Sequence, residues 1–240
     1  MNKFLKIRNK LLKKQGLVAN KKKAINIINF LLDTKYVYHF DWFGIPIIQF
    51  PSDILVLQEL IYKVKPSVII ECGIGHGGSL IFYSSLLKLI KKKFKIIGID
   101  IKIGKNLKKI KKHFLAKNIN LIEKSSTSIE LIPKIKRMIG NNKNILVILD
   151  SNHSEEHVYN ELNLYSKFIS KNNYLVVLDT VIEFVKKKHI NRGRNFSKGN
   201  NPYTAVKKFL MKNKNFKVDK YFENKALITS AYNGFLKKVK

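Results

Sequence analysis

Cysteine and long apolar runs are scarce or missing in this 240-residue chain. The single cysteine, Cys72, excludes an intramolecular disulfide and suits a reducing compartment. No apolar run is long enough to cross a bilayer. Residues 1–20 also lack the uninterrupted apolar core and the cleavage site of a secretory signal peptide. Together these absences predict a cytoplasmic protein.

Acidic residues and arginines are few as well. The chain has 16 Asp and Glu against 47 Lys and Arg, a formal net charge of +31. Nearly all of the positive charge is lysine, whereas reading of bases and bidentate binding of phosphate favour arginine. We therefore expect no specific nucleic-acid partner. The charge is interpreted as a solvated lysine-rich surface, with attraction to an anionic partner as the alternative.

The first 40 residues are basic and have helical periodicity. Segments 3–14 and 21–33 predict two short helices with Leu and Ile on one face. Residues 1–40 are therefore interpreted as a basic helical extension of a domain at 41–240. We expect these helices to pack on that domain or to help form a homo-oligomer. The alternative is a peripheral contact with an anionic membrane.

From residue 68 onward, apolar runs alternate with segments of helical periodicity. Such alternation predicts an α/β fold, a mainly parallel sheet with helices on both faces. The predicted strands are 68–71, 95–99, 120–122, 145–149 and 174–178, and the predicted helices are 78–90, 106–116, 128–139 and 154–169.

The stretch 183–202 is polar and lacks periodicity, so a long loop is expected there. We considered two alternatives: a mobile lid whose Arg192 and Arg194 face anionic substrate groups, and a disordered segment. The other expected elements are a helix that runs to about Val64 with Ser52 or Asp53 as its cap, a helix at 203–212, and a closing pair of strands at 216–222 and 226–229.

A glycine-rich turn follows the first predicted strand of the sheet. Because glycine has no Cβ, a ligand can approach the backbone of such a turn, and the amides that open the next helix can bind it. Asp100 ends the following strand, at about the spacing expected of a carboxylate that binds a ribose hydroxyl. These features predict a nucleoside-binding site.

Two cofactor classes fit this turn. The spacing Gly73-x-Gly75-x-x-Gly78 fits the dinucleotide fingerprint of NAD enzymes. The spacing Glu71-x-Gly73-x-Gly75-x-Gly77 fits the loop that binds S-adenosylmethionine (SAM) in class I methyltransferases. The turn alone does not decide between them.

Polar side chains also follow two later strands. Asp150 and His153 come after the fourth predicted strand, and Asp179 comes after the fifth. The carboxyl ends of parallel strands converge on the ligand crevice, so these side chains are expected to meet. They could hold a hard divalent cation or supply a general base. Alternatively, Asp150 and Ser154 only cap the next helix.

Taken together, these motifs resemble the cephalosporin hydroxylase/rhamnosyl O-methyltransferase family. The resemblance covers roughly residues 38–238, and its most specific parts are His-Gly-Gly-Ser and Asp-Ser-x-His-Ser. The matching pieces are Trp42-x-Gly44, Gln49-x-Pro51-x-Asp53, Ile70-Glu71-x-Gly73-x-x-His76-Gly77-Gly78-Ser79, Gly98-Ile99-Asp100, Ser125-Ser126, Leu149-Asp150-Ser151-x-His153-Ser154, His157-Val158, Glu161-Leu162, Asp179-Thr180, Pro202, Ala205-Val206, Phe209-Leu210 and Gly234-Phe235-Leu236.

The resemblance implies a Rossmann-like SAM-dependent O-methyltransferase that acts on a sugar, glycan or small natural product with the help of Mg²⁺. It implies that Asp150 and Asp179 are metal ligands and, with His153 as a candidate base, the catalytic residues. The family often has a Glu before the second of these acids, whereas this chain has Leu178. The implied SAM-binding residues are Glu71, Gly73, Gly75, His76, Gly77, Gly78, Ser79, Asp100, Ser125, Ser126 and Asp150.

Three rival functions stay open at this point. An NAD-dependent oxidoreductase would need a proton relay such as Tyr-x-x-x-Lys on a helix, which the predicted core lacks. A nucleic-acid or membrane binder would depend on charge alone. A catalytically inactive binding relative is compatible with Leu178.

Overall fold

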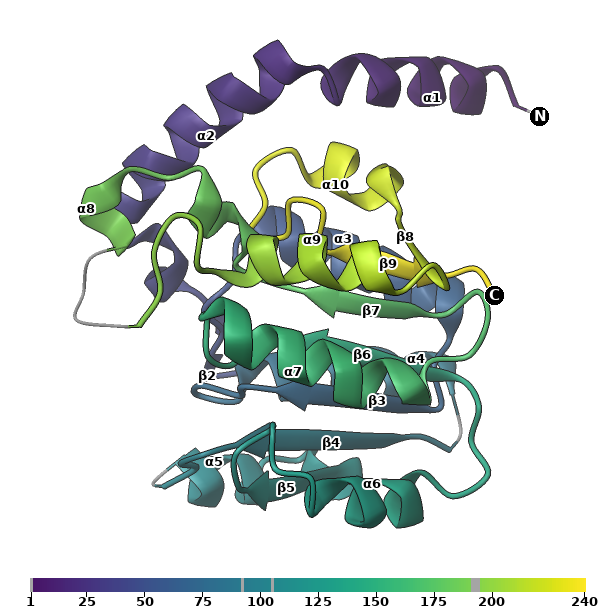
Figure 1. Ribbon diagram of the computed structural model, residues 1–240. Helices are drawn as coiled ribbons and strands as arrows, with labels where there is room; N and C mark the ends of the chain where they lie inside the picture. Colours follow the sequence, from purple (N-terminus) through teal and green to yellow (C-terminus); the bar gives the residue numbers. More distant parts are fainter. Residues whose placement is uncertain (1, 92, 105, 191–194) are drawn as a thin grey trace.

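The computed structural model describes residues 2–91, 93–104, 106–190 and 195–240. Its centre is a seven-stranded sheet made of β3 (Val68–Cys72), β4 (Lys95–Asp100), β5 (Ile119–Glu123), β6 (Ile145–Leu149), β7 (Tyr174–Val177), β8 (Phe216–Val218) and β9 (Phe235–Lys238). The order across the sheet is β5-β4-β3-β6-β7-β9-β8 (Figure 1). The first five strands in this order are parallel, and β9 is antiparallel to β7 and β8.

Helices cover both faces of the sheet (Figure 1). One face carries α3 (Pro51–Val64), α4 (Gly78–Ile90), α5 (Asn106–Lys112) and α10 (Lys220–Ala226); the other carries α6 (Leu131–Ile139), α7 (Glu155–Tyr165) and α9 (Pro202–Lys212). Every residue of β3, β6 and β7 is buried, which explains why these strands are nearly continuous apolar runs. The predicted α/β class is confirmed.

The strand order reverses beside β3, because the chain passes from β3 outward to β4 and β5 and then returns to β6 on the other side. In open α/β sheets, ligands bind beyond the carboxyl ends of the strands at such a switch point. The glycine turn after β3, Asp150 after β6 and Asp179 after β7 all lie there. The topology therefore gathers the predicted site residues in one place.

The N-terminal segment packs on the domain. Helix α1 (Lys3–Gln15) has no buried residue and contacts α10, whereas α2 (Val18–Asp33) buries Ala24 and Ile28. Ile28 belongs to an apolar cluster with Val181, Val185 and Tyr232. The expected packing is confirmed, and within the described ranges no helix has the length and apolar character needed to cross a membrane.

Short elements connect these parts. They are the hairpin of β1 (Asp41–Trp42) and β2 (Ile45–Pro46), the helix α8 (Lys187–Ile190), and 3-10 turns at Tyr36–His39, Ala116–Asn118, Ser166–Phe168 and Thr180–Glu183. Helix α8 and the last turn occupy part of the segment expected to be a long loop. Arg192 and Arg194, which the lid hypothesis assigned to the substrate, lie outside the described residues.

Two predictions near the C-terminus and in α3 are wrong. Helix α10 occupies 220–226, so the first predicted strand is limited to β8; no strand is described at 226–229, and the closing strand is β9. The backbone turns at Leu227, which has a φ of +56°. Neither Ser52 nor Asp53 caps α3. Ser52 donates to the Ile228 carbonyl, and Asp53 is buried and accepts hydrogen bonds from Thr229 and Ser230.

Candidate active site

The glycine turn between β3 and α4 is held in a left-handed backbone conformation. Gly73 has a φ of +84°, and a Cβ there would lie 2.0 Å from the carbonyl oxygen of Asp150. Any larger residue would therefore separate the turn after β3 from the turn after β6. The amide of Ile74 donates a hydrogen bond of 2.9 Å to Asp100 Oδ2, which ties the turn to the end of β4.

Glu71 lies beneath this turn, fully buried at the end of β3. Its two oxygens accept hydrogen bonds from Ser79 Oγ at 2.7 Å and from the Tyr83 hydroxyl at 2.8 Å. Burial raises the pKa of Glu71 from its ordinary value of 4.5 to about 7, the two donated hydrogen bonds counteract the rise, and the charge of Asp100 adds to it. The structure thus places Glu71 as a support for the turn and for α4.

A cavity of about 300 Å³ lies over the turn. We call it the cofactor cleft. Gly75 faces open space, His76 is exposed, and both line this cleft. Gly77 is turned toward Ile110, which a Cβ would touch at 2.3 Å. The cleft is lined by Tyr38, Pro46, Ile47, Ile48, Gln49, Gly73, Ile74, Gly75, His76, Gly78, Ser79, Asp150, His153 and Asp179.

One of the two predicted serines after β5, Ser126, is part of a buried polar network. Ser126 Oγ lies 3.0 Å from His157 Nε2, and the Tyr165 hydroxyl donates to the Ser126 carbonyl at 2.8 Å. His157 is in turn 3.5 Å from Glu161 Oε1, which accepts a 2.6 Å hydrogen bond from Ser151 Oγ. This network fixes the turn after β5 against the turn after β6. Ser125 instead bonds to Thr127 at 3.0 Å.

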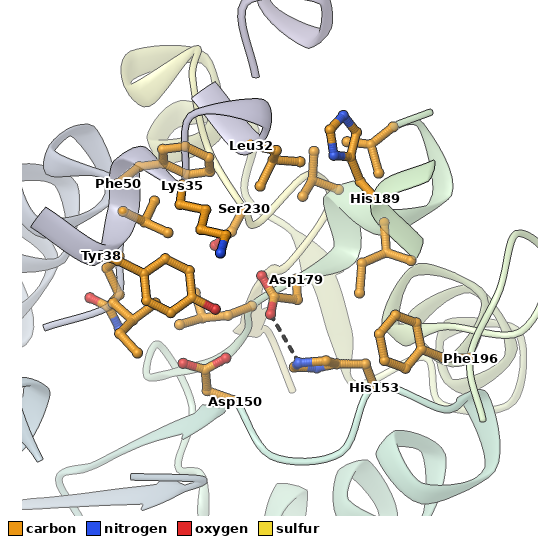
Figure 2. Close-up of a pocket in the computed structure, with 17 residues that line it drawn as sticks. Leu32, Lys35, Tyr38, Phe50, Asp150, His153, Asp179, His189, Phe196 and Ser230 are labelled. Atoms are coloured by element: carbon orange, nitrogen blue, oxygen red, sulfur yellow. Dashed lines mark ion pairs between the residues drawn. The ribbon is translucent and has the colours of Figure 1, made fainter. Parts of the chain in front are cut away.

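A second cavity, of about 180 Å³, adjoins the cofactor cleft. We call it the acceptor pocket. Most of its wall is apolar, and it includes the end of α2 and the residues that follow (Figure 2). The two cavities share Tyr38, Ile48, Gln49, Asp150, His153 and Asp179; the acceptor pocket is also lined by Leu32, Lys35, Val37, Phe50, Leu178, Val181, Ile182, Val185, His189, Phe196 and Ser230.

The three predicted catalytic side chains meet where the cavities join. Figure 2 shows Asp150, Asp179 and His153 directed into one space, with the Tyr38 hydroxyl on its other side. His153 Nε2 lies 3.2 Å from Asp179 Oδ2, and the Phe196 and His153 rings pack in a T-shaped arrangement with centroids 5.3 Å apart. Asp179 has a φ of +55°, a strained value for a residue with a side chain.

Asp150 sits in the most negative part of the site. Burial raises its pKa well above the ordinary value of 3.8, and the charges of Asp179, Glu71 and Asp53 raise it further. Two carboxylates that line the same cavities and repel one another favour a bound cation or a shared proton. The sequence prediction that Asp150 and Asp179 converge is therefore matched by the geometry.

A divalent cation fits these oxygens in part. Within the described ranges, no three His, Cys, Asp or Glu side chains form a cluster that could hold a metal ion. Leu178 lines the acceptor pocket where the family resemblance implies a carboxylate. The donors present are two carboxylates and the neutral oxygen of Gln49, a hard set that suits Mg²⁺ with several waters.

Sequence reasoning missed several pocket residues. Tyr38 and Lys35 belong to the segment treated as an extension, yet both line the acceptor pocket. Phe196 lies in the expected loop and packs on His153. Gln49 was quoted only as a family match. No local pattern marks such residues, because long-range packing of α2 and of the chain after α8 brings them to the site.

Both a family model and curated relatives match this chain. The family model described as Rhamnosyl O-methyltransferase/CmcI matches residues 34–239. The rhamnosyl O-methyltransferase of Mycobacterium tuberculosis (strain ATCC 25618 / H37Rv) is 31% identical over 191 residues, which cover 77% of this chain and 72% of the relative. The chain belongs to the rhamnosyl O-methyltransferase/CmcI family. It is accordingly a SAM-dependent O-methyltransferase, and the expectation from the sequence is confirmed.

Solved structures agree on the fold. A CmcI structure with Mg and SAM superposes with a TM-score of 0.60 at 17% identity, covering 85% of this chain and 78% of that one. An O-methyltransferase from Bacillus cereus in complex with SAH (S-adenosylhomocysteine) gives a TM-score of 0.53 at 11% identity and covers 81% of each chain. The predicted Rossmann-like methyltransferase fold is thus confirmed.

Proposed function

We propose that this family member transfers the methyl group of SAM to a hydroxyl of a sugar, within a glycan or a small glycoside. The observation that supports this most is the junction of the two cavities. A methyl donor on the glycine turn and an acceptor in the apolar pocket would meet at Asp150, His153 and Asp179. Relatives named rhamnosyl O-methyltransferase support a deoxysugar as the first acceptor to test.

The chain's own residues perform most of the catalysis by positioning. The turn from Gly73 to Ser79 and the carboxylate of Asp100 bind the donor. The acceptor oxygen attacks the methyl carbon, the carbon–sulfur bond breaks, and the hydroxyl proton passes to a base. His153 is the candidate base, since Asp179 orients its imidazole at 3.2 Å.

Asp150 and Asp179 would hold a Mg²⁺ ion in this scheme. When bound, the ion supplies a Lewis acid that lowers the pKa of the acceptor hydroxyl.

The acceptor pocket suits the apolar face of a sugar. The rings of Tyr38, Phe50 and Phe196 line it, while Lys35 and His153 supply polar groups. In Figure 2 the Lys35 ammonium and the Tyr38 hydroxyl both extend into the pocket. Such a pairing of aromatic walls with a few polar groups is usual for small-molecule sites.

The direct test is methyl transfer to defined glycosides. Purified protein is incubated with SAM carrying a labelled methyl group and with rhamnosides, other deoxyhexosides and matched hexosides, and products are located by mass spectrometry. A methyl ether on a deoxysugar hydroxyl is the expected product. Labelling of a non-sugar hydroxyl alone would replace the proposed acceptor class, and binding of NAD with no binding of SAM would contradict the donor.

We also propose that α1 contacts an anionic membrane surface. Phe4, Ile7 and Leu11 are 62%, 49% and 57% exposed along one stripe of this helix, although Leu5 and Leu12 on another stripe are half-buried. The helix sequence contains six basic and no acidic residues. A second copy of the chain would place another basic helix against the exposed stripe of α1 and would be repelled, whereas an anionic lipid surface would attract the helix.

A further inference from the structure

The side chain of Gln49 offers an unused oxygen at the junction of the two cavities. Gln49 lines both the cofactor cleft and the acceptor pocket, and only 6% of its surface is exposed. Its Oε1 is buried and has no hydrogen-bond partner among the described residues. Burying a polar atom without a partner is costly, so an unused buried acceptor beside a site indicates a missing ligand.

The other end of the Gln49 amide is accounted for. The side chain hydrogen-bonds to the Tyr83 hydroxyl and counteracts the rise in the pKa of that phenol. A neighbour that lowers the pKa of a phenol presents a donor to it, so the amide nitrogen faces Tyr83. The oxygen at the other end of the amide is the atom that has no partner among the described residues. Tyr83 also donates to Glu71, so the Gln49 amide is held by the buried support of the glycine turn.

The surroundings of this oxygen select a cation as its partner. Asp150 and Asp179 line the same two cavities, and both are acceptors when ionised. The nearby donor His153 is already directed at Asp179. A single substrate hydroxyl donates one hydrogen and satisfies one of these oxygens, whereas a divalent cation binds several oxygens at once.

We propose that Gln49 Oε1 is a third protein ligand of the divalent cation, in place of the carboxylate that Leu178 does not supply. This inference rests on the proposed cation site. A neutral oxygen in place of an anion leaves a site with two negative charges instead of three, which predicts weak and readily exchangeable Mg²⁺. In this proposal one metal ligand comes from the segment just before α3, in addition to the two that follow strands β6 and β7.

Metal affinity itself provides the test, measured in the absence of acceptor. Mn²⁺ binding is followed by electron paramagnetic resonance for the wild type, Gln49→Met, Gln49→Glu and Asp150→Asn, with SAM affinity measured by calorimetry. Gln49→Met keeps the side-chain length and removes the oxygen, while Gln49→Glu adds a charge. Gln58→Met on α3, a half-buried position outside both cavities, is the matched control for folding.

We expect Gln49→Met to weaken Mn²⁺ binding roughly tenfold, which is the scale for losing one charged hydrogen-bonding or ligating contact. Gln49→Glu should strengthen Mn²⁺ binding. Both Gln49 variants should bind SAM within about twofold of wild type. The control, Gln58→Met, should bind Mn²⁺ within about twofold of wild type. Unchanged Mn²⁺ affinity in both Gln49 variants, with weakened binding in Asp150→Asn, would overturn the role of Gln49 alone. A wild type that methylates its acceptor but binds no Mn²⁺ would overturn the cation site as well, and a Gln49→Met variant that loses SAM and not Mn²⁺ would make Gln49 a donor-binding residue.

Discussion

Glu71 makes the stability of this protein depend on pH in a way that one substitution can isolate. Its carboxyl is fully buried, and Ser79 and Tyr83 donate to it. The folded-state pKa is about 7, against an ordinary value of 4.5. Between these two values the folded chain retains a proton that the unfolded chain has released. Stability from this group is therefore complete below pH 4.5 and is lost as the pH rises toward 7.

The magnitude follows from the two pKa values. A rise from 4.5 to about 7 corresponds to roughly 3.5 kcal/mol, at about 1.4 kcal/mol for each pKa unit, and about 3 kcal/mol of this falls between pH 4.5 and pH 8 because half of the unfolded chains are already ionised at pH 4.5. Glu71→Gln keeps the shape of the side chain and removes the titration. Relative to the variant, the wild type should thus lose about 3 kcal/mol of unfolding free energy between pH 4.5 and pH 8. The substitution also alters the hydrogen bonds to Ser79 and Tyr83, which changes the unfolding free energy of the variant by the same amount at pH 4.5 and at pH 8.

Urea unfolding of both proteins at several pH values measures this difference. Groups that do not interact with Glu71 contribute equally to both curves and cancel when one curve is subtracted from the other. Asp150, whose pKa the Glu71 charge raises, also titrates differently in the variant, so the measured difference belongs to Glu71 together with this coupling. A difference that does not change between pH 4.5 and 8 would refute the reasoning. It would mean that Glu71 is solvated or that its charge is compensated by its two donors.

Four further outcomes are expected at the site and its surroundings. Asp100→Ala should weaken SAM binding by about 1–3 kcal/mol in calorimetry, because it removes a charged partner of both the turn and the donor. EDTA should lower turnover and Mg²⁺ should restore it, while Asp150→Asn should lower turnover and leave SAM affinity nearly unchanged. His153→Ala should reduce kcat by roughly 10²–10⁴ if the imidazole is the base. The protein should float with vesicles that contain anionic lipid, and a triple Ala variant of Phe4, Ile7 and Leu11 should not. Self-association through the same face, without lipid binding, would contradict the membrane proposal.

The sequence predicts the centre of this fold well because its signals there are local. The run Val68–Cys72, the glycine turn and the helix Gly78–Ile90 each have the composition of the element that they form. Their order also determines that Asp100 and Asp150 reach the same crevice. The local sequence pattern of strand, turn and helix is therefore sufficient to predict where these site residues lie.

The C-terminal part was predicted less well because tertiary contacts decide it. Residues 226–229 are apolar enough for a strand, but Leu227 turns the chain and the buried Asp53 binds Thr229 and Ser230. That acid comes from the beginning of α3, more than 170 residues away. A contact between such distant residues leaves no mark in local periodicity. Asp53 was therefore expected to be a helix cap from its position in the first turn of α3 alone.

The distribution of charge links the composition to the chemistry. The chain has only 16 acidic residues, yet Glu71, Asp150 and Asp179 all lie at the crevice, and Asp53 is close enough to raise the pKa of Asp150. Lysines meanwhile dominate the exterior. A sulfonium donor and a divalent cation are both positive, so a negative interior at the strand ends attracts them despite a net charge of +31. Concentrating acids at this one place also raises the pKa of Asp150, and bound positive charge would relieve that repulsion. Ligand binding should therefore stabilise the folded chain most at neutral and higher pH, where the unliganded acids repel one another most.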